Sequence, residues 1–383
     1  MRLAVYTDYA YRRDDDGGVY ADRAFVKFVL EMERSLDKLV LLGRANPEPG
    51  RSHHKLPPEV DFVPLPHYPS LNHPLQILGA IPRSLARFWK ALDEVDAAWL
   101  LGPYLLAILF AVLARLRGKP VVLGVRQDLP QYVANRHPGR RPVLWASIVL
   151  DKTFQALSRR LPVVVVGPDL AQNYRRACAI LPISVSLVTE HDLVRQGVIE
   201  RSYDEDLQIL SVGRLETEKN PLLLVDVLAL LREQDARWRL VVCGEGHLEA
   251  ELAARLTALG LEEFASLRGY VPIDGGLQEL YEQSHFLLQV AWTEGFPQTI
   301  VEAFGARLPV VATSVGGVPE GVGDAALLIP PGDAEAAADA LRRLANDAAL
   351  REHLTAAGLE LVRENTLERA SRRVVDFIAA SAG

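Results

Sequence analysis

The stretch LQILSVGRLETEKNP, residues 207–221, is typical of a strand, a charged loop and the start of a helix. Its apolar first half ends at Gly213, and Pro221 stands where proline favours the first turn of a helix. Arg214 and Lys219 lie on the loop between them. Two cations between a strand end and a helix N-terminus suit a diphosphate, although two surface cations on an ordinary loop give the same pattern.

Strand-like apolar runs alternate with helical patterns on both sides of this stretch. The first series is RLAVYT, KLVLL, VDFVPL, AAWLL, PVVLGV and PVVVV, and the second is LQILSVG, WRLVVCG, FASLRGY, HFLLQVA, LPVVATS and AALLIP. Such alternation predicts parallel sheets with helices on both faces. We therefore expect an α/β protein of two doubly wound domains that face a central cleft, with ligands at the carboxyl ends of the strands.

The length of 383 residues exceeds one ordinary hydrophobic core and favours two domains. The first series of strands predicts a domain over residues 1–190, and the second predicts another over residues 206–365. The irregular residues 191–205 are expected to link them. Residues 366–383 are expected to form a C-terminal helix, with packing back on the first domain as one arrangement.

Composition is that of an ordinary soluble protein, with 49% hydrophobic and 24% charged residues. Cys178 and Cys243 form no disulfide framework or metal quartet, which favours a reducing compartment. The N-terminus is typical of a strand and not of a signal peptide, and the apolar run 104–116 is shorter than the roughly 20 residues that cross a bilayer. We expect a cytoplasmic protein, with peripheral contact at the inner membrane face as the alternative.

Charge is divided unevenly between the two halves. Residues 1–190 carry a net charge of +7 and the remainder −14. This asymmetry favours an anionic partner near the first half, although solvated faces alone produce such differences. We expect no nucleic-acid partner.

The segment EGFPQTIVEA, residues 294–303, holds two acids that flank a helix start. Glu294 follows the strand HFLLQVA, and Pro297 and Thr299 suit the first turn, which places Glu302 one or two turns into the helix. Near a helix N-terminus both acids are favoured in the charged form, so they accept hydrogen bonds and do not donate protons. We predict that they hold hydroxyl groups of one extended ligand, while the backbone N–H groups of the intervening residues face an anion or a hydroxyl.

A glycine pair, Gly17-Gly18, follows the first strand and lets a backbone approach phosphate or sugar closely. The three aspartates before it, residues 14–16, suggest a metal site as one interpretation. Contiguous acids on a loop are usually solvated, and no complementary His or acid cluster stands nearby, so we expect no metal. No dinucleotide fingerprint, P-loop or zinc spacing occurs, and we expect no cofactor.

The second half resembles the retaining glycosyltransferases of family 4, which have the GT-B fold of two Rossmann-like domains. Six ordered blocks carry the resemblance: SVGRLETEKN, VVCGEGHLEAEL, LRGYVP, EGFPQTIVEA, LPVVATSVGGVPEGV and LLIPPGD. It is strong over residues 206–335 and weak in the first half, chiefly through the first strand and Gly17-Gly18. By this resemblance the first domain is the acceptor side and the second binds a nucleotide-sugar donor.

The resemblance implies a role for each matching residue. Arg214 and Lys219 would bind the donor diphosphate, Glu294 would contact hydroxyls of the transferred sugar, and Glu302 would contact the ribose. The other implied donor contacts are Gly17, Gly18, Tyr270 and Val271 (the last two beside the nucleobase), Gly295, Phe296, Pro297, Gln298 and Thr299.

One block departs from the family pattern. Many members carry a histidine after a strand of the first domain, whereas this strand reads VVLGVRQDLPQY and offers Arg126, Gln127 and Asp128. Three interpretations stay open: Asp128 orients the acceptor, Gln127 replaces the histidine as a neutral hydrogen-bonding group, or Asp128 caps the next segment.

The activity implied is transfer of a sugar from a nucleotide-diphosphate sugar to an acceptor hydroxyl, with retention and without a metal. The acceptor is an unknown sugar, lipid-linked or small molecule. A non-catalytic nucleotide-sugar binding protein and a sugar-nucleotide epimerase of the same fold are the alternatives.

The helical segment 136–160 has basic ends and an apolar middle, VLWASIVL. Such a helix either packs in the first domain with Trp145 in the core, which we expect, or lies on an anionic membrane.

Overall fold

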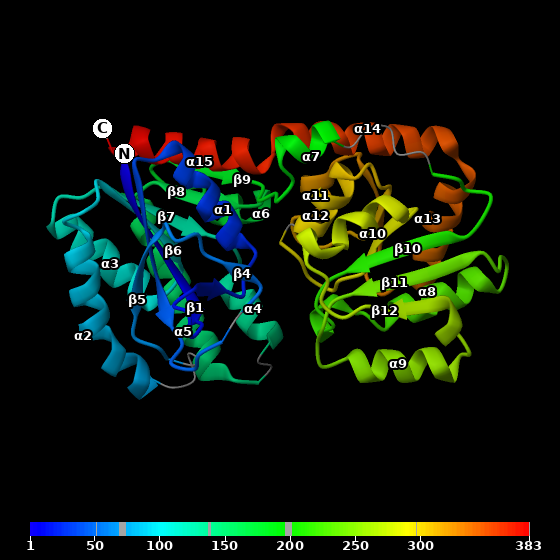
Figure 1. Ribbon diagram of the computed structural model, residues 1–383, viewed down its shortest axis with the longest axis horizontal. Helices are drawn as coiled ribbons and strands as arrows, with labels where there is room; N and C mark the ends of the chain where they lie inside the picture. The colour runs from blue at the N-terminus through cyan, green and yellow to red at the C-terminus, as the bar shows by residue number, and fades with distance from the viewer. Residues whose placement is uncertain (51, 69–73, 137–138, 196–200, 296, 383) are drawn as a thin grey trace. The chain divides into compact units, whose positions relative to one another are not determined.

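The computed structural model describes residues 1–50, 52–68, 74–136, 139–195, 201–295 and 297–382 (Figure 1). The chain divides into two compact units. Unit 1 is Met1–Val185 with Leu367–Gly383, and unit 2 is Ser186–Thr366. The expected linker thus falls within unit 2, and its residues 196–200 lie outside the described residues.

Unit 1 contains a parallel sheet in the order β5-β3-β1-β6-β7-β8-β9. All six runs of the first predicted series are strands of this sheet. Its strands are β1 (Arg2–Arg13), β3 (Lys38–Ala45), β5 (Asp61–Leu65), β6 (Ala97–Gly102), β7 (Val121–Val125), β8 (Val163–Val166) and β9 (Ile180–Ile183).

Helices cover both faces of this sheet because its central strands are apolar on both sides. On one face Tyr6 meets Phe110, which stacks on Phe88 at 4.1 Å between ring centroids. On the other face Trp99 packs against Phe25. The helices are α1 (Phe25–Glu31), η1 (Met32–Ser35), α2 (Pro74–Ala91), α3 (Leu105–Leu116), α4 (Leu129–Arg136), α5 (Arg141–Ser158), α6 (Pro168–Asn173) and α15 (Leu367–Ala382). The C-terminal helix α15 contacts α1 and η1 within unit 1.

The end of β1 carries a hairpin that the sequence did not predict. β1 runs on past Thr7, and β2 (Val19–Ala21) pairs antiparallel with it, followed by β4 (His54–Lys55). Strands of two or three residues are too short to show a period-2 pattern.

The expected position of Trp145 is wrong. Its side chain on α5 is 67% exposed, and Val149 one turn later is 59% exposed. The buried side of α5 is instead formed by Ser147, Phe154 and Ser158. Phe154 is thus the large apolar side chain that this helix buries, while Trp145 and Val149 lie on its outer side.

Unit 2 contains a parallel sheet in the order β12-β11-β10-β13-β14-β15, and all six runs of the second predicted series are its strands. The chain builds one half outward from β10 and then returns to build the other half from β13, which is the doubly wound order. The switch point lies between β10 and β13. The strands are β10 (Leu207–Val212), β11 (Trp238–Cys243), β12 (Ala265–Leu267), β13 (Phe286–Gln289), β14 (Val310–Thr313) and β15 (Ala326–Ile329).

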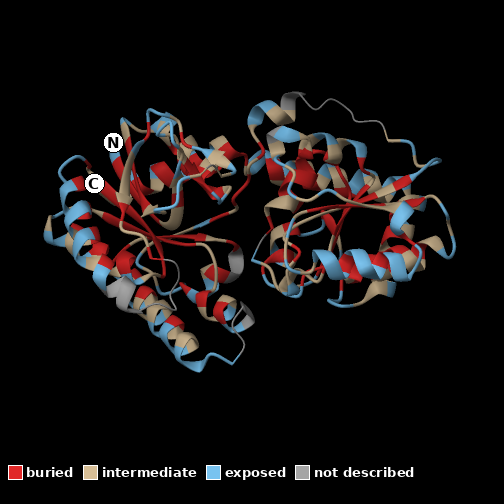
Figure 2. Cartoon of the chain, turned by 60° about the horizontal axis from the view of Figure 1, so that its bottom comes forward, coloured by how far each residue is buried: buried red, intermediate tan, exposed pale blue. Residues whose placement is uncertain are grey.

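Neighbouring residues of β10 enter two different cores, because side chains alternate across a sheet. Ile209 packs with α8 and α13 on one face, and Leu210 packs with α10 and α11 on the other. Figure 2 shows the sheet buried at the centre and the outer helix faces exposed. The helices are α7 (Glu190–Arg195), η2 (Thr217–Lys219), α8 (Leu223–Arg232), α9 (Glu249–Ala258), η3 (Glu262–Phe264), η4 (Ile273–Gly275), α10 (Leu277–Gln283), α11 (Gln298–Gly305), α12 (Val318–Val322), α13 (Ala334–Asn346) and α14 (Ala348–Glu364).

Candidate functional site

The loops that follow β10 and β13 leave the unit 2 sheet at its switch point. Arg214 and Lys219 lie on the first loop, and Glu294 lies on the second, 75 residues further along the chain than Lys219. Because β10 and β13 are adjacent and parallel, both loops start at the same edge of the sheet. The structure brings Lys219 and Glu294 into a salt bridge there.

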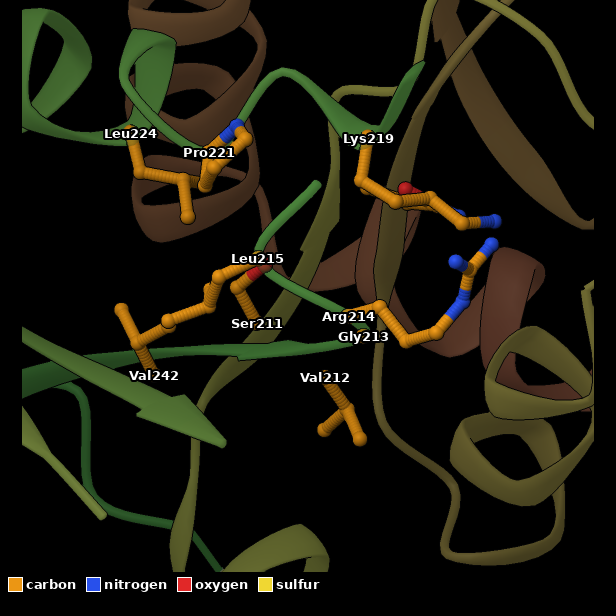
Figure 3. A pocket seen from close by; sticks show the side chains of 10 residues that line it. Ser211, Val212, Gly213, Arg214, Leu215, Lys219, Pro221, Leu224 and Val242 are labelled. Atoms are coloured by element: carbon orange, nitrogen blue, oxygen red, sulfur yellow. The ribbon is translucent and has the colours of Figure 1, made fainter. Parts of the chain in front are cut away.

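A pocket opens beside the first loop, and the side chains of Arg214 and Lys219 extend to the same side of it (Figure 3). Its wall joins the ends of β10, β11 and β13 to the start of α8. The lining residues are Ser211, Val212, Gly213, Arg214, Leu215, Lys219, Pro221, Leu224, Val242 and Gln289.

Each cation of this pocket is paired with a carboxylate. Arg214 Nη2 donates to Glu218 Oε1 at 2.7 Å, and Lys219 Nζ donates to Glu294 Oε1. Gln289 Nε2 donates to the same Glu294 oxygen at 2.7 Å. Burial opposes ionisation of Glu218, but a hydrogen bond from its own backbone and the charges of Arg214 and Lys219 outweigh this and lower its pKa. Glu218 is therefore held as an anion.

Glycines shape the loop that carries Arg214. Gly244 has φ +142°, and a Cβ there would lie 1.8 Å from the carbonyl oxygen of Gly213. Backbone hydrogen bonds tie the same segments, since Gly213 N donates to Cys243 O at 2.9 Å and Leu215 N donates to Glu245 O at 2.9 Å. Residues 244–246, which follow β11, thus pack against the loop that carries Arg214 and hold its backbone in place.

Gly244→Ala is expected to lower the free energy of unfolding by about 3 kcal/mol, because the new Cβ collides with backbone that cannot move alone. Gly260→Ala is the matched control: its φ is +64°, but nothing lies within 4 Å of the place that a Cβ would take, so only the backbone strain of about 1 kcal/mol is expected. Urea unfolding of both variants measures the difference. Equal losses in the two would show that Gly244 has no supporting role.

The loop that carries Glu294 is supported in the same way. Gly316 has φ +51°, and a Cβ there would lie 1.8 Å from the carbonyl oxygen of Glu294. The two site loops are also joined directly, because Trp292 N donates to Glu218 O at 2.9 Å. The backbone therefore fixes where both acids sit.

Glu302 lies on the buried side of α11 and is 9% exposed. Its Oε2 accepts a hydrogen bond from Tyr281 Oη at 2.8 Å. The burial of Tyr281 and the nearby Glu302 charge raise the pKa of that phenol, so Tyr281 stays a donor. The sequence placed Glu302 correctly on the helix but gave no sign of this partner.

The remaining expected donor contacts lie at the same edge of the unit 2 sheet. Gly295, Pro297, Gln298 and Thr299 form the entry to α11, and Phe296 is outside the described residues. Tyr270 and Val271 follow β12, with the Tyr270 side chain 39% exposed.

Gly17-Gly18 forms the turn of the β1–β2 hairpin in unit 1. Asp14 Oδ1 accepts from Gly18 N at 2.6 Å, and Asp14 Oδ2 accepts from Tyr20 Oη at 3.0 Å. In this structure the N–H of Gly18 is thus engaged by the turn itself. Among the described residues, no group of three or more His, Cys, Asp or Glu side chains is arranged to hold a metal ion.

Arg126, Gln127 and Asp128 follow β7 in unit 1. Asp128 Oδ1 accepts from Gln131 N at 2.9 Å, which caps the start of α4. This is the contact expected of the capping interpretation. Arg126 lies over the ring of Phe25, with Cζ 3.8 Å from the ring centroid.

Sequence reasoning missed three residues that hold the site acids or cations. Glu218 had a readable signal, because it stands four residues after Arg214 in the same block. Gln289, at the end of β13, and Tyr281, on α10, had none, because each meets its carboxylate only through the packing of separate elements.

Comparison with known proteins adds a family assignment for unit 2. The sequence model of the family Glycosyl transferases group 1 matches residues 196–360. The O-antigen chain mannosyltransferase B of Escherichia coli is 31% identical over 169 residues, which are 44% of this chain and 44% of that protein. N-acetylgalactosamine-N,N'-diacetylbacillosaminyl-diphospho-undecaprenol 4-alpha-N-acetylgalactosaminyltransferase of Campylobacter jejuni is 32% identical over 148 residues, 38% of each chain. The matches thus span less than half the length of these relatives.

The fold of the whole chain also has a solved counterpart. Sucrose-phosphate synthase from Thermosynechococcus elongatus superposes with a TM-score of 0.73 at 18% identity, covering 99% of this chain and 98% of that one. The chain therefore contains a Glycosyl transferases group 1 domain, and its fold is that of the GT-B glycosyltransferases.

Proposed function

We propose that the protein is a retaining glycosyltransferase that moves a sugar from a nucleotide-diphosphate sugar to an acceptor hydroxyl. The observation that carries the proposal is the meeting of Arg214, Lys219 and Glu294 at the switch point of unit 2. Two cations and a charged acceptor are the groups that a diphosphate and a sugar hydroxyl need. The family match over residues 196–360 supports the same interpretation.

The two cations differ in how easily a diphosphate can recruit them. Arg214 is 41% exposed and its partner Glu218 is 23% exposed, so their ion pair contributes only about 0–1 kcal/mol. A phosphate can replace Glu218 at little cost and gain the fork of the guanidinium. Lys219 and Glu294 are 21% and 10% exposed, so this pair is screened less by water. We propose that Lys219 has two contacts at once: it holds Glu294 in place, and Lys219 itself also binds the diphosphate.

Among the described residues, the side-chain hydrogen bonds to Glu294 reach one of its two oxygens. Lys219 and Gln289 both donate to Oε1, which leaves Oε2 as the atom that faces a ligand hydroxyl. Because a carboxylate only accepts, it selects a hydroxyl donor such as those of a sugar ring. We propose that Glu294 binds the transferred sugar and that Glu302, with Tyr281, borders the ribose.

The chemistry asks for stabilisation of the leaving group. As the bond from the anomeric carbon to the diphosphate oxygen breaks, negative charge grows on that oxygen and positive charge on the sugar ring. Arg214 and Lys219 stabilise the negative charge on the departing diphosphate. The acceptor hydroxyl attacks the anomeric carbon from the same face, and the departing phosphate takes the proton of that hydroxyl. We propose that these side chains supply the charge without a metal.

A panel of UDP-, GDP- and ADP-sugars tests donor binding directly, because a bound donor raises the melting temperature by mass action. One nucleotide class is expected to stabilise the chain, equally with EDTA and with added Mn²⁺. No stabilisation by any member of the panel would contradict the donor site. Stabilisation only after Mn²⁺ is added would contradict metal independence.

The acceptor side includes a surface that suits a membrane. Exposed Trp145 and Val149 lie on one side of α5, with Arg140 and Arg141 at its start and Arg159 and Arg160 after its end. An apolar stripe between basic ends is typical of helices that lie on anionic bilayers. The name of the Campylobacter jejuni relative describes an undecaprenol-linked acceptor. We propose peripheral contact of α5 with anionic lipid; no helix in the described ranges is long and apolar enough to cross a bilayer.

Trp145→Ser is expected to weaken binding to anionic vesicles by about tenfold, since it removes the largest apolar side chain of this surface. Leu116→Ser is the control, because Leu116 is 73% exposed on α3, outside this surface. Cosedimentation with anionic and neutral vesicles at two salt concentrations measures both. Absence of binding to anionic vesicles at low salt would refute membrane contact and favour a soluble acceptor.

A further inference from the structure

Arg126 occupies a position at the carboxyl edge of the unit 1 sheet. It follows the last residue of β7, Val125, and its guanidinium is enclosed by aromatic rings. Cζ lies 3.8 Å from the ring centroid of Phe25 on α1 and 5.7 Å from that of Tyr9 on β1. In parallel sheets this edge is where ligands bind.

The charge of Arg126 has no counter-ion in the part of the chain that the structure describes. Its Nε is inaccessible to solvent and has no hydrogen-bond partner. No carboxylate of the described residues forms an ion pair with it, and burial lowers the pKa of Arg126 to about 9. A charge removed from water without a partner is costly, so a protein that keeps one usually has a use for it.

Two other half-buried arginines, Arg201 and Arg44, are satisfied, whereas Nε of Arg307 and Nε of Arg342 are, like that of Arg126, buried without a partner among the described residues. Arg201 donates to four backbone carbonyls, those of Tyr281, Ser284, Ala306 and Arg307. Arg44 donates to the carbonyls of Asp8 and Tyr68 and pairs with the Asp8 carboxylate. These two arginines hold the fold together, whereas the contacts of Arg126 leave its donors unused.

A second unsatisfied group lies against Arg126. The hydroxyl of Tyr9 is buried and has no hydrogen-bond partner among the described residues. Each buried polar atom without a partner destabilises the empty protein, so two of them on side chains in contact point to a ligand that both receive. Both groups donate hydrogen bonds, and one is a cation.

The ligand group must therefore accept hydrogen bonds and carry a negative charge. A guanidinium fork suits a phosphate, whose several terminal oxygens can also accept from a phenol that approaches from another direction. Arg126 as a whole is only half-buried, so part of the guanidinium can be reached from solvent.

We propose that Arg126 and Tyr9 bind a phosphoryl group of the acceptor, as positioning residues for the sugar transfer. The identity of the bound molecule as the acceptor rests on the proposed function, whereas the anion site itself rests only on unit 1. The phosphoryl group belongs to a soluble sugar phosphate or to a lipid diphosphate, which share this chemistry.

The test uses the full chain with Arg214→Ala and Lys219→Ala as the parent, which removes phosphate binding by unit 2. Melting temperature is followed against inorganic phosphate at constant ionic strength. At about a hundred times Kd the parent is expected to gain roughly 5 °C. Arg126→Met, which keeps the apolar stem over Phe25, is expected to weaken phosphate binding at least about tenfold. Tyr9→Phe is expected to weaken it by about threefold to tenfold.

The melting temperatures without phosphate test whether Arg126 destabilises the ligand-free protein. Because Arg126→Met removes an unpaired charge, its melting temperature is expected to equal or exceed that of the parent. Arg83→Met, at an exposed arginine on α2 of the same unit, is the control and is expected to change neither quantity. Glucose 6-phosphate and a short prenyl diphosphate then replace inorganic phosphate. The ligand that binds more tightly shows whether the phosphoryl group belongs to a soluble sugar phosphate or to a lipid diphosphate.

Two results would overturn the proposal. One is a phosphate response that is the same in Arg126→Met, Tyr9→Phe and the parent; the other is no response in the parent at any concentration. Failure of the proposed function is seen separately, as wild-type protein that no nucleotide sugar stabilises while the phosphate response of unit 1 persists.

Discussion

Arg214→Ala is expected to lower kcat for sugar transfer by about 10²–10³-fold while the fold is preserved. The reason is electrostatic: Arg214 lies on the pocket wall, and its weak ion pair with Glu218 lets it turn to the leaving diphosphate. Lys219→Ala is expected to cause a loss of similar size, because it removes the second cation and also the partner of Glu294. Steady-state kinetics with the donor found in the panel measure both.

The control for these variants is Arg255→Ala. Arg255 is 45% exposed and pairs with Asp226 on the surface of unit 2, which matches the exposure of Arg214. Its loss is expected to leave kcat unchanged and to alter the free energy of unfolding by less than about 1 kcal/mol. Unchanged turnover in both Arg214→Ala and Lys219→Ala would remove the diphosphate assignment.

Glu294→Gln is expected to reduce kcat/KM by about 10–100-fold. The substitution keeps the shape of the side chain but removes the charge that a sugar hydroxyl and Lys219 both use, and a hydrogen bond to a charged group contributes about 1.5–3 kcal/mol. Each 1.4 kcal/mol corresponds to about tenfold in rate.

A matched acid separates this effect from general loss of charge. Glu320 on α12 is exposed, and Glu320→Gln is expected to leave kcat/KM unchanged. Should Glu294→Gln retain full activity with the same donor, Glu294 would have no part in binding the sugar, and Lys219 would act alone.

All six strands of the unit 2 sheet, and six strands of the unit 1 sheet, could be predicted from the sequence because each is a short apolar run bounded by turn residues, whereas β2, β4 and β9 were missed. Residues 207–221 predicted a strand, a cationic loop and a helix start; the structure has β10 and that loop, which includes η2, and α8 begins two residues after Pro221, at Leu223. The contact of Lys219 with Glu294 could not be predicted, because it depends on β10 and β13 being neighbours. Strand order is a property of the folded sheet and not of local sequence.

Side-chain environment was the least predictable feature. The apolar run around Trp145 indicated a buried residue, but the side of α5 that packs inward is formed by Ser147, Phe154 and Ser158. The sequence showed Arg126 only as one of three polar residues after a strand. Its lack of a counter-ion depends on which side chains surround it, among them Phe25 and Tyr9, which are more than 100 residues away in the chain.

Proton NMR of a reaction that starts from an α-linked nucleotide sugar tests the central claim most directly. The claim is that this chain transfers a sugar with retention from a nucleotide diphosphate. The account predicts that the anomeric signal of the donor disappears, that free nucleoside diphosphate forms, and that the new linkage is α. A β-linked product would contradict the same-face reaction. A changed sugar that remains attached to the nucleotide would identify an epimerase, and a donor that is bound but unchanged in the presence of acceptors would identify a non-catalytic binding protein.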